Sequence, residues 1–286
     1  MYARRNLLAD TNAQSHANRF GRCLLPYFYC YYLLLVVKPC LHLPPTLFYL
    51  SPTMVIFKPA DGIFKLINGI FKPTLFFSFQ LLEYMVSKSL LSSMSGLNLN
   101  AQLTEEEESL LRKQIERLEQ APIYLCNEEL NADLLGSTAD KFAKANGIKA
   151  IFIDGLRNIF CPQFDTSAIE ETLQILKTTA IELNVPIVIT DTCKVAGYRN
   201  DFSSLPYYPN FYRTSYDPAF NACDVMLVLH RPEMFGVTVD VQGRDLRNVL
   251  TIGLEKNCQG TKGMVPLKCD FAVKTIEEEM KSDFAL

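Results

Sequence analysis

The chain has 286 residues, of which 49% are hydrophobic and 21% charged; this is close to the globular average and excludes a disordered or collagen-like chain. The net charge of −3 does not indicate a protein whose surface is rich in positive charge for nucleic-acid binding. Residues 1–75 hold eight Lys or Arg and two acidic residues, whereas the remaining 211 hold twenty and twenty-nine. Two different kinds of sequence are therefore joined in one chain.

The nine cysteines are scattered without a CxxC pair, and the three histidines are isolated as well. Metal ligands cluster at short spacing, so we expect neither a zinc site nor a disulfide framework. Buried or free thiols in a reducing compartment fit this usage, and we expect a cytoplasmic protein.

Residues 1–73 lack the pattern of a folded domain. The uncharged span 23–37 is shorter than the ~20 residues that cross a bilayer as a helix, and five prolines between positions 26 and 52 break any longer helix. Four arginines before residue 23 leave a targeting peptide or a single membrane anchor as alternatives. An Ile-Phe-Lys triplet recurs three times between residues 56 and 72. We expect an irregular extension that is not native to the domain after it, and no stable membrane association.

From residue 74 onward, strand and helix patterns alternate. Short apolar runs predict buried strands at 75–79, 123–126, 150–154, 186–190, 224–229, 249–254 and 265–271. Helical patterns cover 82–94, 104–119, 130–146 and 166–184, with an N-cap at Thr104 and a helix end at Asn146-Gly147. Continuous apolar strands separated by helices indicate a mainly parallel sheet covered on both faces. We predict a three-layer α/β fold over residues 74–274 and a tail over 275–286.

Two of the predicted strands end in polar residues, one in Asp154 and the other in Asp191 and Thr192. Ligands bind at the carboxyl ends of such strands, and four apolar residues followed by Asp are the usual form of a strand whose carboxylate orients water on Mg²⁺. An Asp that only caps a turn is the alternative. The chain contains neither GxxxxGK[ST] nor GxGxxG, the loops that bind phosphates through backbone N–H groups.

Eight segments, in the same order and at matching intervals, resemble the RecA-like ATPase domain of DnaB-type replicative DNA helicases. They comprise 75–81, 90–96, 103–107, 123–124, 151–156, 182–187, 222–231 and 256–263. The resemblance implies a RecA-like fold that binds ATP and Mg²⁺. It also implies 5′–3′ movement along single-stranded DNA during replication, and assembly with itself or with other helicase subunits into a ring, a hexamer in this family.

The same resemblance assigns roles to single residues. Asp154 holds Mg²⁺ through water, and Lys256 reaches a nucleotide across a subunit boundary. The catalytic carboxylate of the family falls on Gln80, its sensor Gln on Thr192 and its arginine finger on Cys258. An amide cannot act as a base, and loss of an arginine finger alone costs about 10³–10⁵ in rate. Hydrolysis is therefore expected to be impaired, with Gln80 as a bystander and an ordinary turn lysine as the alternative for Lys256.

Arg213 and Ser215, before the strand at 224–229, resemble a segment of the family near its central DNA channel. Lys194 and Arg199 lie in the loop before them, and such loop cations contact the phosphate backbone in the family. Five aromatic residues between 207 and 216 could stack on bases. Exposed loops also carry cations without function, and aromatic residues also pack a long loop onto a sheet, so both alternatives stay open.

Three functions are compatible with these patterns. The first is a helicase-type ATPase domain, and the second is an inactive RecA-like module that binds helicase subunits or DNA. The third is a recombinase or clock-type ATPase relative, against which the match over residues 103–126 argues because that segment resembles the helicase in particular.

Overall fold

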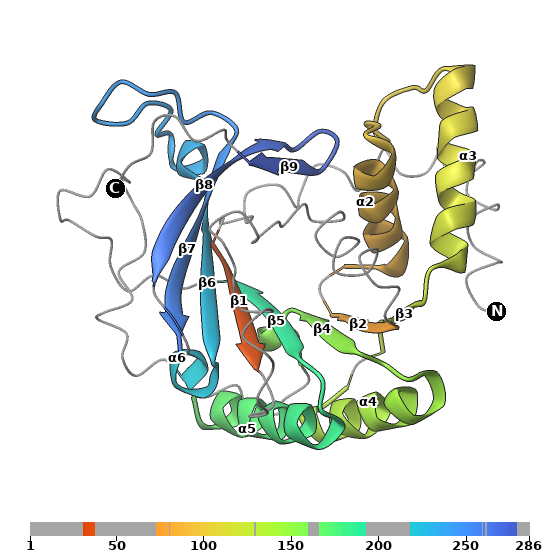
Figure 1. Cartoon of the computed structure of the whole chain (residues 1–286), viewed down its shortest axis with the longest axis vertical. Helices are drawn as coiled ribbons and strands as arrows, with labels where there is room; N and C mark the ends of the chain where they lie inside the picture. The colour runs from red at the N-terminus through yellow and green to blue at the C-terminus, as the bar shows by residue number, and fades with distance from the viewer. Residues whose placement is uncertain are drawn as a thin grey trace, which may run out of the picture.

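A computed structural model of the chain describes residues 31–37, 73–79, 81–128, 130–159, 166–192, 218–258, 260 and 262–278. Within them one sheet has the strand order β3-β2-β4-β5-β1-β6-β7-β8-β9 (Figure 1). The strands are β1 Tyr31–Val37, β2 Thr74–Ser78, β3 Ile123–Cys126, β4 Ala150–Asp154, β5 Ile187–Thr192, β6 Val225–His230, β7 Val249–Asn257, β8 Gly263–Asp270 and β9 Thr275–Glu278. The helices are α2 Glu83–Ser95, α3 Glu105–Gln120, α4 Ala132–Asn146, α5 Thr166–Leu183 and α6 Pro218–Ala222, with 3-10 turns η6 Leu156–Asn158 and η8 Pro232–Phe235.

The strands β3, β2, β4 and β5 are parallel to one another, which confirms the predicted α/β core. Alternate residues of these strands bury apolar side chains on both faces. On one face Phe77, Ile151 and Ile189 pack with α4 and α5, which run along the sheet in Figure 1. On the other face Phe76 of β2 packs against α2. This half of the molecule therefore has the three layers that the sequence predicts.

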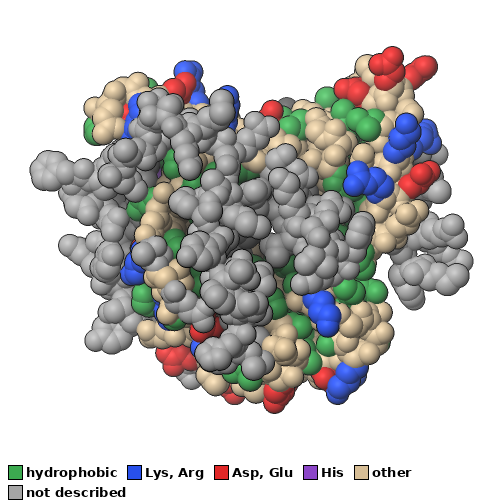
Figure 2. Space-filling model, in the orientation of Figure 1, with side chains coloured by type: hydrophobic (Ala, Val, Ile, Leu, Met, Phe, Trp, Pro, Cys, Tyr) green, Lys and Arg blue, Asp and Glu red, His purple; other side chains and the backbone are tan. Residues whose placement is uncertain are grey.

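Local sequence determines where the helices begin and end. Thr104 and Glu107 form a capping box, in which the Glu107 N–H donates to Thr104 Oγ1 (3.3 Å) and the Thr104 N–H donates to Glu107 Oε2 (2.8 Å). Four glutamates follow Thr104, and Figure 2 shows acidic side chains at that end of α3. They are favoured there because the first turn carries unsatisfied N–H groups. At the end of α4, Gly147 takes the left-handed conformation (φ 63°).

The strands from β6 to β9 form an antiparallel meander. Their positions were predicted, except for β9, which pairs with β8 inside the segment that we expected to be a tail. The pairing directions do not follow from strand patterns, because an apolar run has the same periodicity in either direction. None of the helices in the described part of the chain has the length and apolar character needed to span a bilayer.

One strand comes from the segment that we expected to be irregular. β1 lies between β5 and β6 and is antiparallel to both. Its register pairs Val37 with Ile187, the first residue of β5, and Tyr32 with Thr192 at the other end. The chain therefore leaves β1 at the edge where the parallel strands begin. β2 starts at that same edge, since Thr74 pairs with Ala150.

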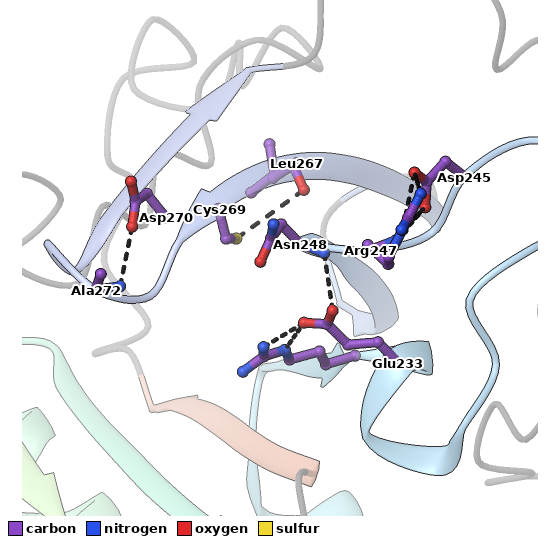
Figure 3. Close-up of polar contacts among 9 residues, drawn as sticks. Glu233, Asp245, Arg247, Asn248, Leu267, Cys269, Asp270 and Ala272 are labelled. Atoms are coloured by element: carbon purple, nitrogen blue, oxygen red, sulfur yellow. Dashed lines mark hydrogen bonds and ion pairs between the residues drawn. The ribbon is translucent and has the colours of Figure 1, made fainter.

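Two polar networks hold the connection between β6 and β7. Figure 3 shows Glu233 accepting from the Asn248 N–H through Oε2 (3.0 Å). Its other carboxylate oxygen pairs with Arg231, whose guanidinium lies 3.3 Å from the centre of the Phe271 ring. Because these contacts join η8 to the residue before β7 and to the turn after β8, they fix the base of this connection to the meander.

Asp240 organises the outer part of the same connection. Its Oδ1 accepts the N–H groups of Gln242 (2.9 Å) and Arg244 (2.8 Å), and its Oδ2 accepts from Arg244 Nε (2.5 Å). Burial alone would raise the pKa of Asp240, but the bonds from Arg244 and Gln242 hold this pKa below its usual range. The charged carboxylate therefore stabilises the turn.

We expect Leu34→Pro in β1 to lower the free energy of unfolding by at least about 3 kcal/mol. Leu34 pairs with Thr190 on one side and Leu227 on the other, and proline removes an N–H and clashes within a central strand. Urea unfolding of the full chain measures the change. Leu34→Val, which keeps the N–H, is the control, and equal midpoints for the two variants would show that β1 does not hold the sheet.

Asp240→Asn should destabilise the protein at pH 7 and change its stability little near pH 2. A carboxyl whose folded pKa is depressed contributes fully above its unfolded pKa of about 3.9, and loses the contribution as the pH falls through the folded value. Urea unfolding at both pH values tests this. Asp245→Asn is the control, because Asp245 pairs with Arg247 on the surface with its side chain 53% exposed, where ion pairs contribute little. A loss for Asp240→Asn independent of pH would contradict the assignment.

Candidate functional site

The carboxyl ends of three parallel strands align at one edge of the sheet. Ser78 of β2 pairs with Asp154 of β4, which pairs with Thr190 of β5. The Thr190 hydroxyl donates to Asp154 Oδ1 over 2.6 Å. The structure thus brings the predicted Asp154 to the strand ends where ligands bind in open α/β sheets.

The backbone after Asp154 turns sharply and locks the edge in place. Gly155 has a φ of 96°, a conformation that favours glycine, and its N–H donates to the Thr190 carbonyl (3.1 Å). The Phe79 N–H donates to the Asp154 carbonyl (3.1 Å), and Asn158 Nδ2 donates to the Phe79 carbonyl (3.3 Å). The ends of β2, β4 and β5 are therefore tied together by both backbone and side chains.

Burial and hydrogen bonding act on Asp154 in opposite directions. Burial raises the pKa of this carboxyl because the charged form loses solvation, and the hydrogen bond from Thr190 lowers it. The net pKa lies above the ordinary value for Asp. A cation bound beside Asp154 would favour the charged carboxylate and offset the cost of burying it. A Mg²⁺ site requires this charged form.

The residues at this edge fit a water-mediated Mg²⁺ contact. Mg²⁺ keeps most of its water and is held by one or two carboxylates together with substrate phosphates. Asp154 supplies one carboxylate, whereas the Ser78 hydroxyl donates to the Leu81 carbonyl (2.7 Å). Among the described residues there is no group of three or more His, Cys, Asp or Glu that could hold a metal alone. Tight Mg²⁺ binding here therefore needs phosphate oxygens as further ligands.

The end of β5 differs from the expectation that Asp191 and Thr192 lie beside Asp154. Asp154 meets Thr190, which the sequence analysis did not single out, and Asp191 is buried on the other face of β5 with Ile187 and Ile189. Thr190 could have been found from the sequence by aligning the predicted parallel strands, because this places it beside Asp154. For Thr192 the structure describes only the backbone, at the end of β5.

Lys256 lies far from this edge. It is on β7 beside Met226 near the start of β6, and four strand steps of about 4.8 Å separate β7 from β4, so it lies roughly 19 Å to the side of Asp154. Its Nζ donates to the Phe220 carbonyl (2.6 Å) and the Asn221 carbonyl (3.2 Å). Lys256 and Asp154 of one chain therefore cannot bind the same phosphate group.

The other predicted residues lie outside the described part of the chain. These are Gln80, Lys194, Arg199 and Arg213. Their assignments, like the role of Lys256 across a subunit boundary, stay predictions.

A family model for the DnaB-like helicase C terminal domain matches residues 63–278. The chain belongs to this family. The match begins before β2 and ends at the last residue of β9, so the helicase domain includes both the parallel core and the antiparallel meander. The resemblance drawn from the eight segments is confirmed at the level of the family. A search of curated proteins found no match.

Two solved structures share the fold of this helicase domain. One is a DnaB-like replicative helicase solved to examine its interactions with primase, at 15% identity and a TM-score of 0.60 over 73% of this chain. This chain covers 51% of that protein, about half of its length. The other is an ATPase domain, at 16% identity and a TM-score of 0.61, with 73% of this chain and 75% of that one covered.

We expect Asp154→Asn to raise the thermal unfolding temperature at pH 7. A carboxyl with a raised folded pKa costs stability above that pKa, and the cost disappears as the pH falls below the unfolded value of about 3.9. Asparagine avoids the charge and still accepts from Thr190. Thermal melts at pH 3 and pH 7 test this, with Glu116→Gln on the exposed face of α3 as the control. A gain that is equal at both pH values would exclude the buried charge as its cause.

Proposed function

We propose that this chain is the ATPase domain of a DnaB-type DNA helicase in which the Mg²⁺ position is retained and hydrolysis is impaired. The observation that carries the proposal is Asp154 at the aligned strand ends, half-buried, hydrogen-bonded to Thr190 and with a raised pKa. Its carboxylate would orient a water on Mg²⁺ bound between nucleotide phosphates. The metal would supply charge stabilisation for phosphoryl transfer.

The groups that complete catalysis in the family are missing from this sequence. No GxxxxGK[ST] loop occurs, Gln80 stands at the position of the catalytic carboxylate, and Cys258 stands at that of the arginine finger. An amide cannot take a proton from water, and a thiol carries no positive charge towards a phosphate. These groups bind phosphate, activate water and stabilise charge during hydrolysis. We therefore propose that their loss lowers the rate of ATP hydrolysis and does not change the substrate.

The direction of β1 supports a second candidate, an inactive module that binds helicase subunits or DNA. A phosphate loop beside Asp154 has to follow a strand whose carboxyl end reaches that edge. β1 ends at the other edge, with Val37 beside Ile187. Val37 at the end of β1 and Thr74 at the start of β2 therefore both lie at the edge away from Asp154.

Substrate and assembly follow the family in this proposal. The domain would act on single-stranded DNA in replication, within a ring formed with itself or with intact helicase subunits. Lys194, Arg199 and Arg213 would contact the phosphate backbone, and such contacts weaken as salt rises. ATP and Mg²⁺ are the cofactors proposed.

ATP turnover with and without single-stranded DNA tests the proposal on the full chain. We expect turnover lower by at least about 10³ than that of a domain with a complete site, and abolished in Asp154→Ala. Asp133→Ala on the surface of α4 controls for loss of an acidic side chain.

Each remaining outcome decides between the two candidates. Turnover equal in wild type and Asp154→Ala would refute the role of Asp154. Undetectable turnover and undetectable Mg-ATP binding, together with retained binding of single-stranded DNA, would establish the inactive module instead.

A further inference from the structure

The side chain of Asp154 is held by a single residue of the neighbouring strand. The Thr190 hydroxyl donates to Asp154 Oδ1 over 2.6 Å, a length typical of a hydrogen bond to a charged carboxylate. Within the described part of the chain no other group donates to this carboxylate. Asp154 is only half-buried, so Oδ2 is the oxygen that remains for water or for a metal-bound water.

The sheet fixes the place of Thr190 beside Asp154. The two residues are register partners of the parallel strands β4 and β5, so their side chains project from the same face. The Gly155 N–H donates to the Thr190 carbonyl (3.1 Å), which ties the residue after Asp154 to the same point of β5. Because a β-branched side chain is stiff at χ1, the hydroxyl of Thr190 has little freedom of its own. Its position is therefore set by the backbone.

The neighbours of Asp154 on β2 do not take part in holding the carboxylate. Ser78 is the register partner of Asp154 on that side, but its hydroxyl donates to the Leu81 carbonyl (2.7 Å). The Phe79 N–H donates to the backbone carbonyl of Asp154 (3.1 Å) and not to its side chain. The backbone of Asp154 is thus held from both sides, whereas the orientation of its carboxylate depends on β5 alone.

We propose that Thr190 is a positioning residue, which holds Asp154 Oδ1 and so presents Oδ2 to a water on Mg²⁺. Residues that hydrogen-bond a ligating carboxylate fix its orientation, and their loss typically lowers metal affinity by about 10–100-fold. Mg²⁺ demands near-ideal octahedral geometry, so a carboxylate that is free to rotate holds its water less well. The orientation of Asp154 stands on the hydrogen bond itself, and only its consequence for Mg²⁺ rests on the proposed function.

A loss of stability alone does not distinguish this role from that of a threonine that merely satisfies a strand-end carboxylate. Removing the hydroxyl leaves Oδ1 without a donor, which destabilises the fold in either case. Thr179 on α5 offers a matched control, because it is buried and its hydroxyl donates to the Ile175 carbonyl (2.9 Å). Thr179→Val removes a buried hydroxyl of the same kind without touching Asp154.

Crystal structures of the full chain without nucleotide or metal test the orientation directly. We expect one rotamer of the Asp154 carboxylate in wild type and in Thr190→Ser, which keeps the hydroxyl. In Thr190→Val the carboxylate should be turned or occupy several rotamers, and Thr190→Ala is the second variant if valine disturbs the packing. The wild-type rotamer in both the valine and the alanine variant would overturn the proposal.

Binding of Mn²⁺ together with AMP-PNP, an ATP analogue that is not hydrolysed, is the second readout and is followed by electron paramagnetic resonance. Thr190→Val should bind Mn²⁺ about tenfold more weakly than wild type, whereas Thr190→Ser and Thr179→Val should bind it like wild type. Equal affinity in wild type and Thr190→Val, or equal weakening in both valine variants, would refute a role of Thr190 at the metal. If wild type binds no Mn²⁺ with AMP-PNP, the proposed function fails, while the crystal structures still decide whether Thr190 orients Asp154.

Discussion

The position between β5 and β6 is the constraint on which the rest of the structure depends. Ile189 of β5 and Val228 of β6 are both fully buried in the same core cluster, so the sheet is continuous only if a strand fills the space between β5 and β6. β1 fills it with six paired residues on each side. A sheet can hydrogen-bond to strands of either direction, and nothing in the pairing alone selects the direction that a phosphate loop would need.

The direction of β1 matters for phosphate binding but not for the alignment of the parallel strands. The parallel strands β2, β4 and β5 align Ser78, Asp154 and Thr190 at one edge, as a nucleotide-binding sheet requires. That alignment depends only on the parallel core. The reversed β1 keeps the sheet continuous, but its last residue, Val37, lies at the edge away from Asp154. The sheet can thus be continuous with β1 in this direction, whereas a phosphate-binding loop beside Asp154 would have to follow a strand of the opposite direction.

The helix ends show the same division between local and distant causes. Thr104 and Glu107 cap α3 through residues three apart, so the sequence alone predicts the start of that helix. The end of α6 is satisfied by Lys177 and Lys256, which are 79 residues apart in the sequence. A lysine on a predicted helix and another near the end of a strand carry no sign that they meet, since neither spacing nor periodicity links them.

The sequence by itself predicted most of the elements after residue 74 and the three-layer core, because hydrophobic periodicity and capping depend on residues that are close together in the chain. The family followed from the resemblance of eight segments and from the match of its model. The sequence also placed Asp154 at a strand end and established that GxxxxGK[ST] is absent. Only the tertiary structure decided that residues 31–37 form the strand between β5 and β6. It also decided that Thr190 rather than Asp191 donates a hydrogen bond to Asp154, and that Lys256 donates to the end of α6. Each of these depends on which strands become neighbours and in which register, and the periodicity of a strand is the same whatever strand lies beside it.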